Sequence, residues 1–217
     1  MPHHARDERH SLSATLRSAG PDAPTLCGDW TTKELAAHLA LRERSLVEMA
    51  GRLPVDRVQR YAESDMRAYA SSEPYERLVE QVDVGPSWKD SPVAAVWALP
   101  PVREFANLLE YLVHHEDVRR ASPGWAPRVL PVAVQEAVWK RLPGAARLTA
   151  RSLRPAVRLV WPSYGSIKAG KGKPAVTVVG DPVELALFVF GRQRVAVVDY
   201  AGDAADIEIV SGARIGI

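Results

Sequence analysis

The sequence predicts an α+β protein: a mainly helical bundle over residues 1–150, followed by a small α+β domain over residues 151–217. Two observations support this division. Up to about residue 150, apolar residues recur at helical spacing between breaks that contain Pro or Gly. Beyond about residue 155, β-branched runs at residues 157–161 and 175–179 alternate with turn residues. A chain of 217 residues is long enough for one large domain and a smaller appendage.

Composition narrows the classes of partner. Lys+Arg 28 against Asp+Glu 26 gives a net charge of +2, which is too balanced to indicate a nucleic-acid or membrane-surface partner. The single cysteine, Cys27, excludes an intrachain disulfide and any multi-cysteine metal site. The amino terminus lacks the apolar core of a signal peptide, and the most apolar run, residues 183–190, is too short to span a bilayer. We therefore expect a soluble cytoplasmic protein.

The first helix is expected over residues 5–19, ending at Gly20. A second helix begins with a capping box, in which Thr31 caps and Glu34 follows three residues later. It is expected to run to about residue 50. On this helix His38 shares a face with leucines and points toward the core, and Arg42 lies one turn further along the same side.

Residues 55–72 and 74–84 are expected to form one or two more helices of unclear register. Others are expected over residues 105–117 and 132–153, the last of them bent or broken at Pro143. Successive helices of this kind pack naturally as a bundle. In the smaller domain, residues 165–174 read as a solvated hairpin loop that carries Lys168, Lys171 and Lys173. A helix capped by Asp181 follows, then a strand over residues 194–200 and a last short element of undecided type.

The most informative stretch is the helix at residues 105–117, where Glu110, His114 and Asp117 stand at i, i+4 and i+7 and so share one face. Apolar residues lie beside this stripe and place it close to the core. A charge buried there is costly unless an opposite charge compensates it. A divalent metal is one such compensator.

His38 supplies the third candidate ligand, beside Glu110 and His114. Catalytic zinc sites commonly use three protein ligands of these types and leave a fourth position for water or substrate. Spacing alone leaves an alternative open, in which the histidines are core residues and the Glu–His pair is a surface contact. Asp117 would either orient a ligand imidazole as an outer-sphere carboxylate or pair with Arg120 or Arg42. His115 points to another side of the helix, where a surface position is expected.

These residues carry a resemblance. The combination of Trp30-Thr31, His38, then Glu110-x-x-x-His114 with Asp117 close behind, resembles the mycothiol-dependent maleylpyruvate isomerase-like family. Residues 180–203 are similar to the small carboxy-terminal domain of that family. The resemblance covers nearly the whole chain and implies a DinB-like four-helix bundle followed by a small α+β domain.

The resemblance also implies a function. It suggests zinc, or another divalent metal, at His38, Glu110 and His114, with mycothiol or a similar low-molecular-weight thiol as cofactor. The expected reaction is isomerisation or S-transfer on a small electrophilic substrate, because a metal-activated thiolate can add to an activated double bond. Arg42 and Arg192 are the candidates for binding the thiol or the substrate, with Arg194 as a rival of Arg192. The alternative is a non-catalytic protein that binds a metal or a small ligand.

Overall fold

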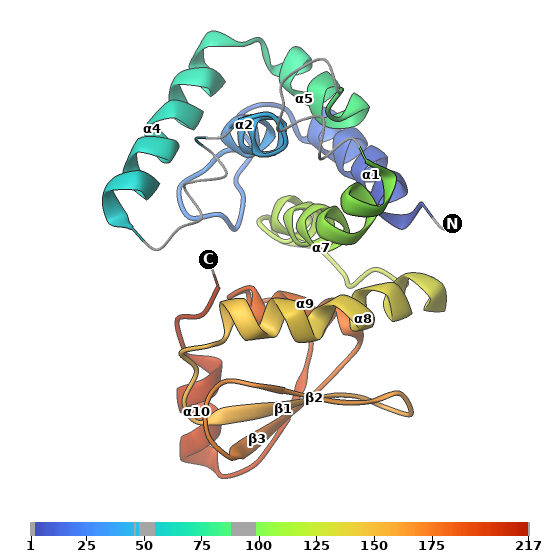
Figure 1. Cartoon of the computed structure of the whole chain (residues 1–217), viewed down its shortest axis with the longest axis vertical. Helices are drawn as coiled ribbons and strands as arrows, with labels where there is room; N and C mark the ends of the chain where they lie inside the picture. The colour runs from blue at the N-terminus through green and yellow to red at the C-terminus, as the bar shows by residue number, and fades with distance from the viewer. Residues whose placement is uncertain (1–2, 46, 48–54, 88–98, 217) are drawn as a thin grey trace. The chain divides into compact units, whose positions relative to one another are not determined.

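The computed structural model describes residues 3–45, 47, 55–87 and 99–216. These residues form eight helices and a four-stranded sheet, which confirms the α+β class (Figure 1). The chain divides into two compact units, Met1–Trp125 and Ala126–Ile217. Each unit has its own core and is described by itself. No helix within the described residues is long and apolar enough to cross a membrane.

The first unit is a helical bundle. Its helices are α1 (His4–Ala19), α2 (Thr32–Arg42), α4 (Asp56–Ser72), α5 (Tyr75–Val84) and α7 (Pro100–Arg119). Helix α1 packs along α7 and α5, and α2 packs against α4 and α5. Leucines from four of these helices fill the core with no exposed surface: Leu12, Leu16, Leu35, Leu78, Leu108 and Leu112. Burial of these side chains, at roughly 2 kcal/mol each, is the main force that holds the bundle.

Helix α2 begins as predicted but ends early. The Thr31 side chain accepts a hydrogen bond from a first-turn backbone N–H, and Glu34 accepts one from the backbone N–H of Thr31, so the capping box is present. The helix stops at Arg42, not near residue 50, and Arg44 just beyond its end makes contacts with another helix. Its guanidinium donates to the backbone carbonyls of Gln81 and Gly85 at the end of α5. Residues 46 and 48–54 lie outside the described part of the chain.

The second unit is a sheet with helices on it. The strands β1 (Ala156–Trp161), β2 (Gly165–Ala169), β3 (Pro174–Val179) and β4 (Asp199–Ala201) form a sheet of order β2-β1-β3-β4. Strand β1 is antiparallel to β2 and parallel to β3, and β3 is antiparallel to β4. Helices α8 (Val132–Thr149) and α9 (Pro182–Val189) lie side by side along the sheet in Figure 1, while α10 (Ala204–Ser211) packs against β3.

Several expectations for this half of the chain differ from the structure. Helix α8 runs unbroken through Pro143, which is exposed, so solvent can reach the turn where the proline removes a backbone donor. Strand β2 lies within the expected hairpin loop. The expected strand over residues 194–200 is reduced to β4, and the undecided last element is α10. The sequence places the residues of α8 in the bundle of residues 1–150. In the structure α8 belongs to the second unit and packs on α9 and β2.

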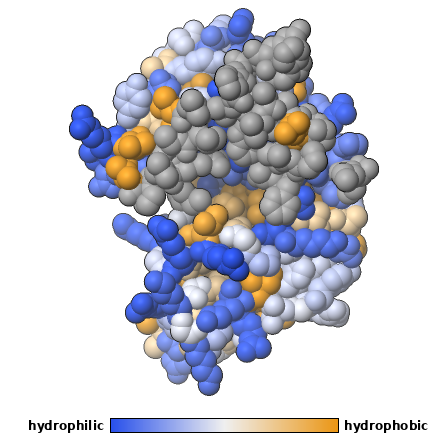
Figure 2. All heavy atoms as spheres, viewed as in Figure 1, coloured by the Kyte–Doolittle hydropathy of each residue, from blue (hydrophilic) through white to orange (hydrophobic). Residues whose placement is uncertain are grey.

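The described surface is mixed in character. On the face drawn in Figure 2, hydrophilic residues cover most of the described surface, and hydrophobic residues appear in smaller groups among them. This agrees with a mean hydropathy of −0.14 for the chain. A surface of this kind is ordinary for a folded domain.

Candidate metal centre

Three side chains from two helices converge in the first unit. His38 comes from α2, and Glu110 and His114 come from α7. Oε1 of Glu110 lies 3.9 Å from Nε2 of His38 and 3.6 Å from Nε2 of His114. One ligand atom of each residue lies within 4.8 Å of the others. The structure therefore brings together the three residues that the sequence singled out.

Local structure explains why these residues meet. The capping box fixes where α2 begins and hence which face carries His38. Glu110 and His114 are one helical turn apart, so their side chains project over the same part of α7. The imidazole rings of His38 and His114 pack edge to face, with centroids 5.4 Å apart, and the Trp30 indole lies 5.2 Å from the His38 ring.

The donor set fits a zinc ion. Two imidazole nitrogens and one carboxylate oxygen are a set found in catalytic zinc sites. Ligands held at about 2.1 Å from a tetrahedral ion are about 3.4 Å apart, and the separations from Glu110 to the two histidines are close to this value. The three side chains keep between 12% and 19% of their surface exposed, so an ion or a small ligand can reach them from solvent.

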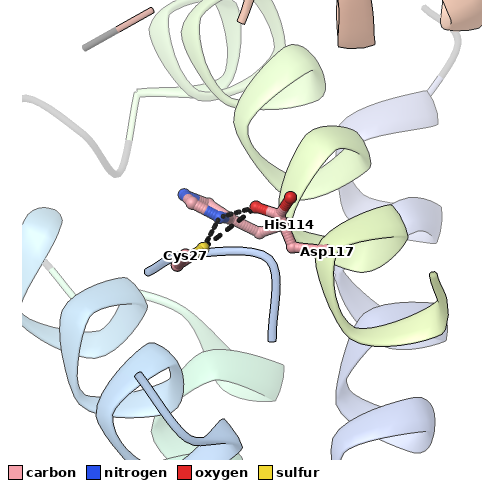
Figure 3. Close-up of side chains that lie close together, drawn as sticks. All are labelled: Cys27, His114 and Asp117. Carbon is pink, nitrogen blue, oxygen red and sulfur yellow. Dashed lines mark hydrogen bonds and ion pairs between the residues drawn. The ribbon is translucent and has the colours of Figure 1, made fainter. Parts of the chain in front are cut away.

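Asp117 and Cys27 lie beside Nδ1 of the His114 ring (Figure 3), whereas Glu110 lies near Nε2. Oδ2 of Asp117 is 2.9 Å from Nδ1 of His114 and accepts a hydrogen bond from the Cys27 thiol at 3.0 Å. Asp117 is fully buried. A carboxylate on Nδ1 fixes the ring and leaves Nε2 facing Glu110 and His38, as in metal sites whose histidines are oriented by an outer carboxylate.

Cys27 was not expected at this site from the sequence. It belongs to the turn-rich connection before α2, and the backbone N–H of Leu26 donates to the carbonyl of Asp117 at 3.1 Å, which anchors this connection to α7. Cys27, His114 and Asp117 form a second group of potential metal ligands. A position in an irregular connection has no periodicity to predict it, so only the tertiary structure could reveal this neighbour.

Opposing effects set the pKa of His114. Burial lowers it, but the electrostatic influence of the neighbouring Cys27 sulfur and the hydrogen bond to Asp117 raise it, and the net pKa lies well above the ordinary value. In the metal-free protein His114 therefore holds its proton more firmly than an ordinary histidine does. A metal must displace this proton to bind Nε2.

A network of buried polar side chains contacts Glu110 through Arg42. Nε of Arg42 lies 3.2 Å from Oε1 of Glu110, and Arg42 also donates to the Asn107 side chain. Asn107 in turn donates to Glu43, which accepts a second hydrogen bond from the Tyr111 hydroxyl at 2.6 Å. Burial, followed by the charge of Glu43, raises the pKa of Tyr111 far above its usual range, so its hydroxyl stays a donor.

This network changes how Arg42 must be interpreted. From the sequence, Arg42 is a candidate for binding the thiol or the substrate. In the structure only 2% of its side chain is exposed, and it contacts Glu110 and Asn107. Glu43, Asn107 and Tyr111 were not singled out from the sequence, because their partners lie on another helix.

His115 is not the surface residue that its position on α7 suggested. It is buried, with Nδ1 2.7 Å from Oε1 of Glu8 and Nε2 2.8 Å from the Thr15 hydroxyl. Both partners belong to α1, so the imidazole joins α1 to α7. The position of His115 on its own helix predicts exposure, but α1 covers this side of α7.

The two candidate arginines of the smaller domain lie in the second unit. Arg192 is half-buried, and its guanidinium donates to the backbone carbonyl of Phe190 at 2.6 Å. Arg194 is exposed. Both stay candidates for contact with a small anionic ligand.

Comparison with known proteins decides the family. The model of the family described as mycothiol maleylpyruvate isomerase N-terminal domain matches residues 3–119. The chain belongs to this family. The matched segment runs from the start of α1 to the end of α7, so all three candidate ligands of this mycothiol maleylpyruvate isomerase-type domain lie within it. The resemblance noted in the sequence is thereby confirmed.

Solved structures agree with this assignment. A histidine-to-alanine variant of mycothiol-dependent maleylpyruvate isomerase matches with a TM-score of 0.60, and a second structure of that enzyme matches with a TM-score of 0.55. Each is 18% identical to this chain, and each match covers 93% of this chain and 92% of the other. They show that both units share the fold of that enzyme. No curated protein matches this chain.

Proposed function

We propose that this protein binds a divalent metal, zinc by preference, and uses mycothiol or a similar low-molecular-weight thiol to isomerise a small electrophilic substrate or to transfer the thiol to it. The observation that carries the proposal is the convergence of His38, Glu110 and His114 in a family whose namesake enzyme is mycothiol-dependent. The expected compartment is the cytoplasm, where such thiols are kept reduced.

The residues around the centre have separate tasks in this proposal. His38, Glu110 and His114 would hold the ion, and Asp117 would hold the Nδ1 proton of His114 so that Nε2 is the metal-binding atom. A bound divalent ion would lower the pKa of a coordinated thiol and so raise the fraction of nucleophilic thiolate.

Arg42 has a supporting task. Its guanidinium would hold Glu110 in place when no metal is bound, because an opposite charge stabilises a carboxylate that is largely withdrawn from water. Since Arg42 is held inside the bundle, Arg192 and Arg194 are the better candidates for contacting the acid groups of the substrate or thiol. A guanidinium suits that task because it can bind a carboxylate through two parallel hydrogen bonds.

The proposal can be tested by turnover. Protein loaded with zinc should consume maleylpyruvate, or another small electrophile with an activated double bond, only when mycothiol is present. Activity should be lost after chelation and in Glu110→Gln. Glu76→Gln, which removes the same charge from an exposed position on α5, is the matched control and should keep full activity.

The two parts of the proposal fail separately. Zinc binding without any thiol-dependent turnover across a panel of such electrophiles would favour a non-catalytic metal-binding protein. Thiol-dependent turnover that survives both chelation and Glu110→Gln would contradict the assigned metal site instead.

A further inference from the structure

The second unit contains a segment that has basic residues and no acidic ones. Residues 137–180 include nine Lys or Arg residues and no Asp or Glu, although the net charge of the whole chain is only +2. The remainder of the chain is therefore net acidic, and positive charge is concentrated in α8, the first three strands and their connections. Balanced overall composition conceals this asymmetry.

Part of this segment lines a pocket. The pocket has a volume of about 580 Å³ and lies between the second half of α8 and strand β2 with the loop that follows it. This is within the usual size range for a small-molecule site. Among the described residues that line the pocket there is no carboxylate, and four are cations: Arg147, Arg151, Lys168 and Lys171. The hydroxyl of Ser166 also lines it.

The backbone brings these cations together by specific contacts. Gly170 has a φ of +88°, and a Cβ at this position would lie 2.6 Å from the carbonyl oxygen of Leu153. The N–H of Lys171 donates to that same carbonyl at 3.3 Å. These contacts hold the loop after β2 against the chain that leaves α8, so Lys171 and Arg151 line one cavity although they are distant in sequence. Strand β2 is an edge strand, which leaves this side of the sheet accessible.

The four cations have no internal counter-charge in the described part of the chain. No described carboxylate forms an ion pair with Arg147, Arg151, Lys168 or Lys171. Arg147 stands in the last turn of α8, where a cation is favourable to the helix dipole, but this reason does not extend to the two lysines on β2 and its loop. Like charges gathered around one cavity repel one another unless an anion joins them.

We propose that this basic pocket, defined by Arg147, Arg151, Lys168 and Lys171, binds a small polyanion that carries at least two phosphate or carboxylate groups. Guanidinium groups on one wall can each take an acid group through paired hydrogen bonds, and ammonium groups on the opposite wall can take a second one. The pocket belongs entirely to the second unit and uses none of the proposed metal ligands. It is a binding site additional to the metal centre.

Calorimetric titration of the full-length protein with inorganic tripolyphosphate, and separately with citrate, tests the proposal at roughly 150 mM salt, where weak surface attraction is screened. We expect one anion bound per chain, and the tighter of the two anions identifies the preferred acid group. The double variant Arg151→Gln/Lys168→Gln should weaken binding by at least about tenfold through the loss of charge-assisted hydrogen bonds.

The matched control is Lys140→Gln/Lys173→Gln, which removes two exposed cations of the same acid-free segment from outside the pocket. It should change affinity by no more than about twofold, because screened charges outside the site contribute little. Unchanged melting temperatures would show that both variants fold. The proposal would be overturned if the two variants weakened anion binding equally or if neither anion bound. Binding of a single-stranded RNA oligonucleotide but of neither anion would also overturn it.

Discussion

The guanidinium of Arg42 lies against the carboxylate of Glu110, with Nε 3.2 Å from Oε1 and only 2% of the arginine side chain exposed. The proposed metal ligand is therefore already paired with a buried cation that is fixed in the fold. An ion at this centre would share Glu110 with Arg42. The pair links the stability of the bundle to occupancy of the site.

Substitution of Arg42 tests this link. Arg42→Met should lower the free energy of unfolding of the metal-free protein by about 2 kcal/mol, because it removes the buried ion-pair partner of a partly buried carboxylate. Zinc would supply the missing positive charge, so the rise in melting temperature on adding zinc should be larger in the variant than in the wild type. Differential scanning calorimetry with and without zinc measures both effects. Equal increases in the two proteins would show that the ion does not share Glu110 with Arg42.

Asp117 is expected to act on the metal through His114. Asp117→Ala should lower zinc affinity by about 10- to 100-fold, the usual cost of losing a carboxylate that orients a ligand imidazole. Competition with a chromophoric chelator measures this. Cys27→Ala is the control: it removes the thiol that shares Oδ2 of Asp117 and should change zinc affinity by no more than about threefold. Loss of zinc in Cys27→Ala would instead place the ion between Cys27, His114 and Asp117.

The raised pKa of His114 predicts a specific pH dependence. The folded-state pKa lies well above the ordinary histidine value of about 6.5, so metal-free folded protein binds more protons than the unfolded chain above that pH. The stabilisation is fully present below about pH 6.5 and is lost as the pH rises through the folded-state pKa. Urea unfolding of the metal-free protein should therefore show stability falling as the pH rises above neutrality. In Asp117→Asn this slope should be shallower; an identical slope would mean that another group carries it.

Zinc binding should follow the opposite trend. The ion needs a neutral imidazole, so zinc affinity should rise with pH over the range in which His114 loses its proton, and binding near neutral pH should release a proton. Calorimetry in two buffers of different ionisation enthalpy measures the released proton. An enthalpy independent of the buffer would show that His114 is already neutral or is not a ligand.

Most of the fold could be predicted because its signals are local. Thr31 and Glu34 mark the start of α2, apolar spacing marks α1 and α7, and the breaks around residues 55–84 mark α4 and α5 although their apolar register is unclear. Two features could not be predicted from local signals. Helix α2 ends at Arg42, and β2 forms in a Gly- and Lys-rich stretch because β1 is there to pair with it.

The candidate site shows the same division. Glu110 and His114 could be paired by their spacing on one helix, and His38 by its inward face. Other residues that contact the ligands have no such local signal. Cys27 belongs to an irregular connection, and Asn107 and Glu43 belong to a buried hydrogen-bond network that joins α7 to the end of α2. His115 was assigned to the surface because its partners on α1 are about a hundred residues away in sequence.

The most direct test is an anomalous difference map at the zinc edge, from crystals of untagged protein grown with zinc. The account predicts one peak per chain, within bonding distance of Nε2 of His38, Nε2 of His114 and the carboxylate of Glu110, and no peak in crystals of His38→Ala. A map without a peak at this position, or with its peak among Cys27, Asp117 and Nδ1 of His114, would contradict it.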